Sequence, residues 1–313
     1  MFSVVIQTLS ITAPVFVMLL VGVALMRLRW IDGPFIHTAS TLVFKGTMPT
    51  LLFLSVIKSD LNAALQPALL VYYIGATVGG FLLAWAWALW RCPVADRGVY
   101  VQGAFRGNNG VVGLALATSL YGDYGLSLGG VLAGLVIFLY NSLSAVVLAI
   151  YSPDGQADAR AIILSILRNP LIIGVSAAIP FAYWQIPLPD WLMTSGQYFA
   201  QLTLPLALIC IGGTLSISAL RESSGVAMSS SLMKMVWFPA IATAGAWLCG
   251  FRGAELGVLF LYFGCPTASS SFVMARAVNS NHQLAATIIV ITTLAAALTI
   301  NVGLFLLRWL GWV

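Results

Sequence analysis

Charged residues are scarce in this sequence. Only 7% of the 313 residues are Asp, Glu, Lys or Arg, whereas a soluble domain carries about 25%. Hydrophobic residues make up 60% of the chain, and the mean hydropathy is +0.99. No soluble fold of this size could bury so much apolar surface. The sequence therefore indicates an all-α integral membrane protein that lies in a lipid bilayer.

Groups that support catalysis or metal binding are also few. All nine Asp and Glu residues fall in loops or at the ends of apolar runs, and neither of the two His residues lies deep within a run. An intramembrane aspartyl or serine protease needs such groups at membrane depth, so we expect no enzyme. The four cysteines lack metal-ligand spacing, and we expect them to be small buried residues and the chain to have no cofactor; they are Cys92, Cys210, Cys249 and Cys265.

Ten apolar runs are long enough to cross a membrane, because a bilayer core about 30 Å thick needs roughly 20 helical residues. They cover residues 3–26, 34–57, 66–90, 98–121, 125–150, 162–183, 190–217, 231–250, 255–277 and 283–310. No Lys or Arg precedes the first run, which is too long for the core of a signal peptide. We therefore expect a retained span there.

The basic residues predict the orientation. One set of connections holds Arg27, Arg29, Arg91, Arg97, Arg160, Arg168 and Arg221. The opposite side holds mainly Lys58, Arg252 and Arg308. The positive-inside bias places the first set in the cytoplasm. The protein would then lie in the cell membrane (the inner or plasma membrane) with both termini on the outer side. Because these charges are scattered at helix ends, nucleic acid is not an expected partner.

The two halves of the chain echo each other. Three pairs of short segments recur at offsets of 156 to 158 residues, namely 13–15 with 169–171, 47–52 with 203–208, and 108–110 with 266–268. We therefore predict two repeats of five spans, residues 1–155 and 156–313. Since five is odd, the second repeat enters the bilayer from the opposite face, an arrangement found in secondary transporters. A duplicated membrane protein without a transport role is the alternative.

Spans four and nine are interrupted near their middles. Span four contains Gly107–Gly110, a run of poor helix formers, and span nine contains Pro266, which removes a backbone donor. Irregular backbone at that depth is tolerated where it lines a cavity. We predict that residues 108–110 and 265–268 are non-helical and meet, each presenting the N-terminus of a half-helix to one site. Ordinary kinks filled by neighbouring helices are the alternative.

Two basic residues, Lys45 and Arg106, lie inside predicted spans, and no carboxylate is expected at their depth. A bound anion would compensate Arg106, while snorkelling or contact with carbonyl groups is the alternative for both. Lys234 lies near the expected start of span eight, where we expect it to snorkel. The predicted substrate-binding residues are Arg106, Asn108, Asn109, Gly110, Cys265, Pro266, Thr267, Ser269 and Lys45. Candidate ligands for a coupling ion are Asn108, Thr267, Ser270 and Ser271.

These residues resemble those of the auxin efflux carrier family, which includes malonate-type bacterial carriers and plant PIN-type exporters. The resemblance covers the whole chain and rests on 108–116 with Tyr121-Gly122, on 266–268, and on 205–208 with Gly212-Gly213. Lys45 resembles a lysine of the plant members. Two departures stand out: Ala115 replaces a family proline, and residues 66–90 lack the acidic residue that plant members carry in span three.

The resemblance implies a ten-helix carrier with an elevator fold similar to that of bile-acid/sodium symporters. Spans 1, 2, 6 and 7 would form a scaffold domain, which could join two copies into a homodimer, and spans 3–5 and 8–10 a transport domain. The implied substrate is a small organic anion, a mono- or dicarboxylate. A channel and a membrane receptor or sensor for a small organic acid are the alternatives. Coupling to Na⁺, coupling to H⁺ and uniport all stay open.

Overall fold

The computed structural model describes residues 17–58, 66–152, 168, 170–214, 225–268 and 270–313. Within these ranges every regular element is helical, and extended backbone pairs in one isolated bridge. A helical chain with several apolar helices agrees with the predicted all-α membrane fold class. The arrangement as ten spans in two inverted repeats stays a prediction.

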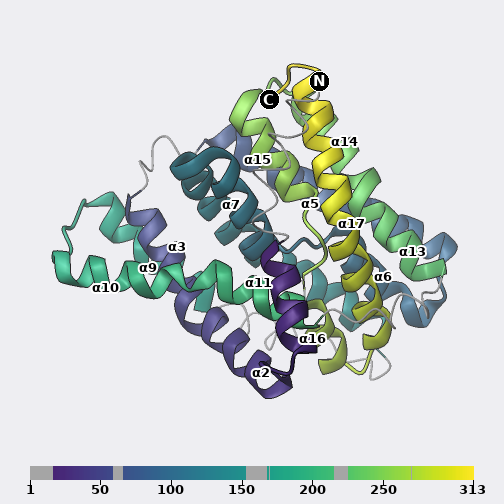
Figure 1. The fold of residues 1–313 in the computed structure, drawn as a ribbon. Coiled ribbons are helices and arrows are strands. Elements are labelled where there is room, and N and C mark those ends of the chain that lie inside the picture. Colours follow the sequence, from purple (N-terminus) through teal and green to yellow (C-terminus); the bar gives the residue numbers. More distant parts are fainter. Residues whose placement is uncertain (1–16, 59–65, 153–167, 169, 215–224, 269) are drawn as a thin grey trace.

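The helices form two groups that lie side by side (Figure 1). The first group contains α2 (Gly33–Leu42), η1 (Val43–Thr47), α3 (Met48–Lys58), α9 (Pro170–Tyr183), α10 (Asp190–Gln201) and α11 (Thr203–Thr214). The second begins with α5 (Pro67–Arg91), η2 (Val94–Asp96), α6 (Arg97–Phe105), η3 (Asn109–Gly113) and α7 (Leu114–Ile150). It continues with α13 (Gly225–Leu232), η4 (Met233–Trp237), α14 (Phe238–Leu248), α15 (Gly253–Phe263), α16 (Ser270–Ala277) and α17 (His282–Trp309).

Packing within each group is closer than packing between them. In the first group α9 and α10 both lie against α3, and α2 packs on α11. A further apolar helix, Val17–Arg27, approaches α11 closely, because a Cβ on Gly22 would lie 2.2 Å from the carbonyl oxygen of Ile209. In the second group α6 contacts α5, α7, α13 and α17. α7 also contacts α3 and α9, so it connects the two groups.

Three described helical stretches are long and apolar enough to cross a membrane, namely Pro67–Arg91, Asn109–Ile150 and His282–Trp309. The other predicted spans are divided by breaks and wide turns or include residues outside the described ranges. The stretch that ends at Ile150 holds the second half of expected span four and the whole of span five. The two parts are separated within α7 at Gly122, which has φ 57° and ψ −136°. Glycine adopts this backbone conformation readily, whereas other residues are strained there.

Three wide π-helical turns interrupt the helices. η1 ends shortly before Pro49, η4 shortly before Pro239, and η3 follows the break at Asn108. Proline lacks an N–H group and its ring crowds the carbonyl of the preceding turn, so a wider turn relieves that contact. Such turns are frequent at functional sites. Lys45 and Lys234 both lie in them.

We expect Gly122→Ala to destabilise the protein, because a side chain is disfavoured at φ 57°. A cost of about 1–2 kcal/mol corresponds to a fall of roughly 2–8 °C in the melting midpoint, measured by thermal unfolding in detergent. Gly75→Ala in α5 is the control, because a Cβ there meets nothing within 4 Å and alanine favours helix. Equal losses in both variants would contradict the conformation assigned to Gly122.

Candidate functional site

Two broken helices cross within the second group. One is interrupted between α6 and η3, the other between α15 and α16. In the gaps, Gly107 and Thr267 form an antiparallel bridge, and the amide of Asn108 donates to the carbonyl oxygen of Pro266 at 2.7 Å. The prediction that the interrupted segments meet is therefore confirmed.

The first break lies slightly earlier than predicted. Arg106 already has extended backbone, with φ −80° and ψ 120°, while Asn109 and Gly110 belong to η3. The carbonyl oxygen of Asn108 accepts from the amides of Val112, at 2.9 Å, and Gly113, at 3.2 Å, which closes the wide turn. The helix thus resumes within the Asn-Asn-Gly run, and the prediction that residues 109 and 110 are non-helical is wrong.

Gly107 is the point of closest approach at the crossing. A Cβ placed on it would lie 2.3 Å from Oδ1 of Asn109 and 3.3 Å from both Cβ of Cys265 and Nζ of Lys234. The first of these atoms belongs to the Asn109 side chain in the same segment, and the contact with Cys265 across the crossing is tight. Glycine at position 107 therefore leaves room both for the Asn109 side chain and for the close approach of the second segment.

Thr267 fastens the crossing to its neighbours. Its hydroxyl donates to the carbonyl oxygen of Gly103 on α6 at 2.8 Å, and its amide donates to Oγ1 of Thr292 on α17 at 3.1 Å. A free amide of the second broken helix is therefore paired by α17, and a carbonyl near the end of the first broken helix is paired by the Thr267 side chain, as burial in a membrane protein demands.

A cavity of about 1560 Å³ opens beside the crossing, between the two groups of helices. Its walls come from α2, η1, α11 and the Val17–Arg27 helix on one side, and from residues 106–108, η3, α7, α16 and α17 on the other. Four basic residues line it, and none of its lining residues is Asp or Glu; the basic residues are Arg27, His37, Lys45 and Arg106. The described wall is therefore electropositive.

Arg106 is held at the crossing by neutral partners. Its Nη2 donates to Oδ1 of Asn141 at 2.9 Å and to Oγ of Ser270 at 2.8 Å, while its Nη1 donates to Sδ of Met274 at 2.7 Å and Oγ of Ser144 at 3.4 Å. Its Nε is buried without a partner, and the side chain is 6% exposed. The guanidinium is oriented, but none of these contacts neutralises its charge.

The two asparagines differ in their roles. Asn109 is buried, and its Nδ2 donates to the hydroxyl of Tyr73, while its Oδ1 has no hydrogen-bond partner among the described residues. Asn108 is only partly buried, and both asparagines and Gly110 line the cavity. Asn108 is thus the more accessible of the two to a ligand.

The other predicted site residues are divided between the cavity and the core. Lys45 is exposed on the opposite wall of the cavity, in η1. Ser270 lines the cavity and accepts from Arg106, whereas Ser271 is buried with an unpartnered hydroxyl. Ser269 lies outside the described residues. Cys265, Pro266 and Thr267 do not line the cavity.

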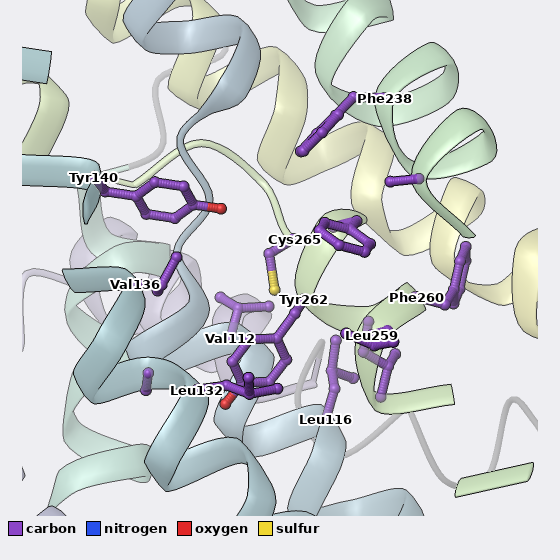
Figure 2. Close-up of a cluster of buried hydrophobic side chains, with 14 of the residues drawn as sticks. Val112, Leu116, Leu132, Val136, Tyr140, Phe238, Leu259, Phe260, Tyr262 and Cys265 are labelled. Atoms are coloured by element: carbon purple, nitrogen blue, oxygen red, sulfur yellow. The ribbon is translucent and has the colours of Figure 1, made fainter. Parts of the chain in front are cut away.

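Cys265 faces the core behind the crossing, among side chains of α7, η3 and α15. Figure 2 shows Val112 and Tyr262 close to its sulfur, with Tyr140 above them. The hydroxyl of Tyr262 donates to the carbonyl oxygen of Gly129 at 2.6 Å, which fixes the ring beneath the crossing. This packing holds the crossing in place, and of these residues Tyr140 also lines the cavity.

Lys234 is the site residue that sequence reasoning missed. It is 0% exposed, and its Nζ donates to the carbonyl oxygen of Phe263 at 2.8 Å, so the expected snorkelling is wrong. The predicted span began at residue 231, but α13 already includes Gly225. The predicted span left out Ser229 and Ser230, yet both bond α6: the hydroxyls of Ser229 and Tyr100 lie 3.1 Å apart, and Ser230 donates to the Tyr100 carbonyl.

Comparison with known proteins identifies relatives over nearly the whole chain. A family model described as "Membrane transport protein" matches residues 8–304. An uncharacterized transporter of Methanocaldococcus jannaschii is 23% identical over 287 residues, which are 88% of this chain and 88% of that protein. A Rhizobium meliloti protein named "Putative malonate transporter" is 24% identical over 310 residues, 96% of this chain and 95% of that protein.

We expect Thr267→Val to loosen the crossing, because it removes the bond to Gly103 and leaves a buried carbonyl unpaired. Such a loss costs about 1–3 kcal/mol, measured as a lower melting midpoint in detergent. Thr299→Val is the matched control, because the Thr299 hydroxyl bonds the carbonyl of Ala295 within its own helix. A control that is equally destabilised would show that Thr267 does not tie the two helices together.

Proposed function

The chain belongs to the membrane transport protein family, and we propose that it is a secondary carrier that moves a small organic anion across the cytoplasmic membrane. The proposed substrate is a mono- or dicarboxylate, bound in the cavity beside the helix crossing. The proposal joins the family membership to the charge and geometry of that cavity.

The proposal of an anionic substrate rests mainly on the guanidinium of Arg106. Arg106 borders the cavity, and its described partners are all neutral, so its charge is not compensated within the described residues. A cation in the low-dielectric interior is stabilised by a bound anion, and the N–H groups that begin η3 add partial positive charge nearby. The side chain of Asn108 supplies a further hydrogen-bonding group on the same wall.

A dicarboxylate would use both sides of the cavity. Lys45 is exposed on the wall formed by η1, while Arg106 lies on the wall formed by the crossing. One carboxylate would bind Arg106 and the second would face Lys45. The name of the Rhizobium relative supports the same chemistry, so malonate is the first compound to test.

The proposed mechanism is elevator-like alternating access within two inverted repeats. In support, α6 and α15 both end in phenylalanine before the crossing, at positions 158 residues apart. The first group of helices would be the scaffold and the site of a homodimer contact, and the second the moving transport domain. Because Arg27 lines the cavity and belongs to the basic side of the chain, the cavity would face the cytoplasm in the predicted orientation.

We expect Arg106→Gln to weaken binding of a dicarboxylate by roughly ten- to a hundredfold, because hydrogen bonds to charged groups contribute about 1.5–3 kcal/mol. The loss of affinity should be larger for malonate than for a monocarboxylate such as acetate, because acetate carries only one negative charge for the site to stabilise. The measurement is calorimetric or thermal-shift titration of the purified protein.

Arg252→Gln is the matched control. Arg252 bonds the carbonyl oxygens of Trp247 and Phe251, and it does not line the cavity. Its replacement should leave malonate binding unchanged. Counterflow of labelled malonate into liposomes separates a carrier from a sensor, because a sensor binds without exchange. Unchanged affinity in Arg106→Gln, or a best ligand that is a cation, would overturn the proposed site.

A further inference from the structure

We propose that Lys234 is a resident cation of the helix crossing. Its ammonium occupies the place that an alkali metal ion would otherwise take, so anion binding and transport need no sodium. This inference rests on the proposed carrier function for its consequence in transport, and on the geometry of Lys234 for the rest. Lys234 is a positioning residue here, because it acts through the crossing rather than by contact with the substrate.

The position of Lys234 is the first step. The side chain starts from η4 and reaches the end of α15, where Nζ donates to the Phe263 carbonyl oxygen at 2.8 Å. The same Nζ lies 3.3 Å from where a Cβ of Gly107 would stand, so it reaches the first broken helix as well. It also lies 5.2 Å from the centroid of the Phe238 ring. The ammonium therefore sits against both interrupted segments.

The ends of helices explain why a cation is needed there. The last four carbonyl groups of a helix lack partners in the helix, and together they carry about half a negative charge. Phe263 is the last residue of α15, and the crossing buries it completely. Water does not reach the Phe263 carbonyl, so a neighbouring donor must pair it, and a cationic donor also offsets the partial negative charge of the helix end.

The cost of burying Lys234 supports the same conclusion. Among the described residues it forms no ion pair, and its neighbours are Phe238, Phe263 and Cys265. A methionine of similar length would avoid the desolvation of a charge. Buried charges in membrane helices usually serve function, and here the contact made by the charge is with the crossing.

Two of the four predicted sodium ligands already form hydrogen bonds to protein groups. The hydroxyl of Thr267 donates to Gly103, and Oγ of Ser270 accepts from Arg106. A sodium ion would need several such oxygens, and it would be repelled by Nζ of Lys234 at short range. The crossing thus has its positive charge without an ion from solution.

The first test uses the unaltered protein. Its melting midpoint, and the shift of that midpoint by malonate, should be the same in sodium chloride and in choline chloride at equal ionic strength. Malonate uptake into liposomes should likewise differ by less than twofold between the two salts. A requirement for sodium in either measurement would overturn the inference.

The second test removes the cation and returns it. Lys234→Ala deletes the equivalent of n-propylammonium, and it should lower the melting midpoint by at least about 2–4 °C. Added n-propylammonium, or sodium, should recover part of that loss by binding the folded state. The neutral 1-propanol, which fills the same space, should not.

Lys234→Met keeps the length of the side chain and fills the space that n-propylammonium would enter, so n-propylammonium should not rescue it. It also provides a folded variant if Lys234→Ala does not fold, and it should then lose malonate binding at least tenfold. Rescue of Lys234→Ala by 1-propanol as well as by n-propylammonium, or wild-type behaviour of Lys234→Met, would overturn the inference. Cation rescue without any response to malonate would contradict the proposed substrate and leave the resident cation supported.

Discussion

The constraint on which the rest of this structure depends is that backbone polar groups inside a membrane need partners. Two helices stop within the second group, and each leaves unpaired carbonyls and amides behind. Some of these groups are paired by the bridge between Gly107 and Thr267 and by the bond from the Asn108 amide to the Pro266 carbonyl oxygen, and glycine at position 107 leaves room for this close approach. The two interrupted segments do not pair all of their backbone groups with each other. Thr292 accepts from the Thr267 amide, and Lys234 donates to the Phe263 carbonyl oxygen.

Much of this arrangement could be predicted from residue types. Pro266 and the Asn-Asn-Gly run predicted two helix breaks. The matching positions of these breaks in the two halves indicated that the interrupted segments meet. Arg106 was found because a guanidinium in an apolar run lacks a sequence neighbour of opposite charge. These signals are local, since each depends on what a residue does to its own helix or to its own solvation.

The features that could not be predicted depend on contacts between distant segments. The predicted start of span eight at residue 231 placed Lys234 near the membrane surface. Ser229 and Ser230 instead bond Tyr100 on α6, so the helix begins earlier and Lys234 is buried. Thr267 looked like a ligand because its hydroxyl is polar and near a break, but the hydroxyl donates a hydrogen bond to the carbonyl oxygen of Gly103. Cys265 is directed to the core by Val112 and Tyr262, which are remote in the sequence (Figure 2).

The placement of the two buried cations bears on what the carrier can move. Arg106 follows α6 and Lys234 lies in η4, so both belong to the second group of helices. In the proposed mechanism they would travel together with the bound anion. Moving one elementary charge across a membrane potential of 100 mV involves about 2.3 kcal/mol. A dianion would balance the two fixed charges, whereas a monoanion would leave one positive charge on the moving domain. Arg106 and Lys234, the two cations at the crossing, would therefore set how strongly transport depends on the membrane potential. This dependence would differ between mono- and dicarboxylates.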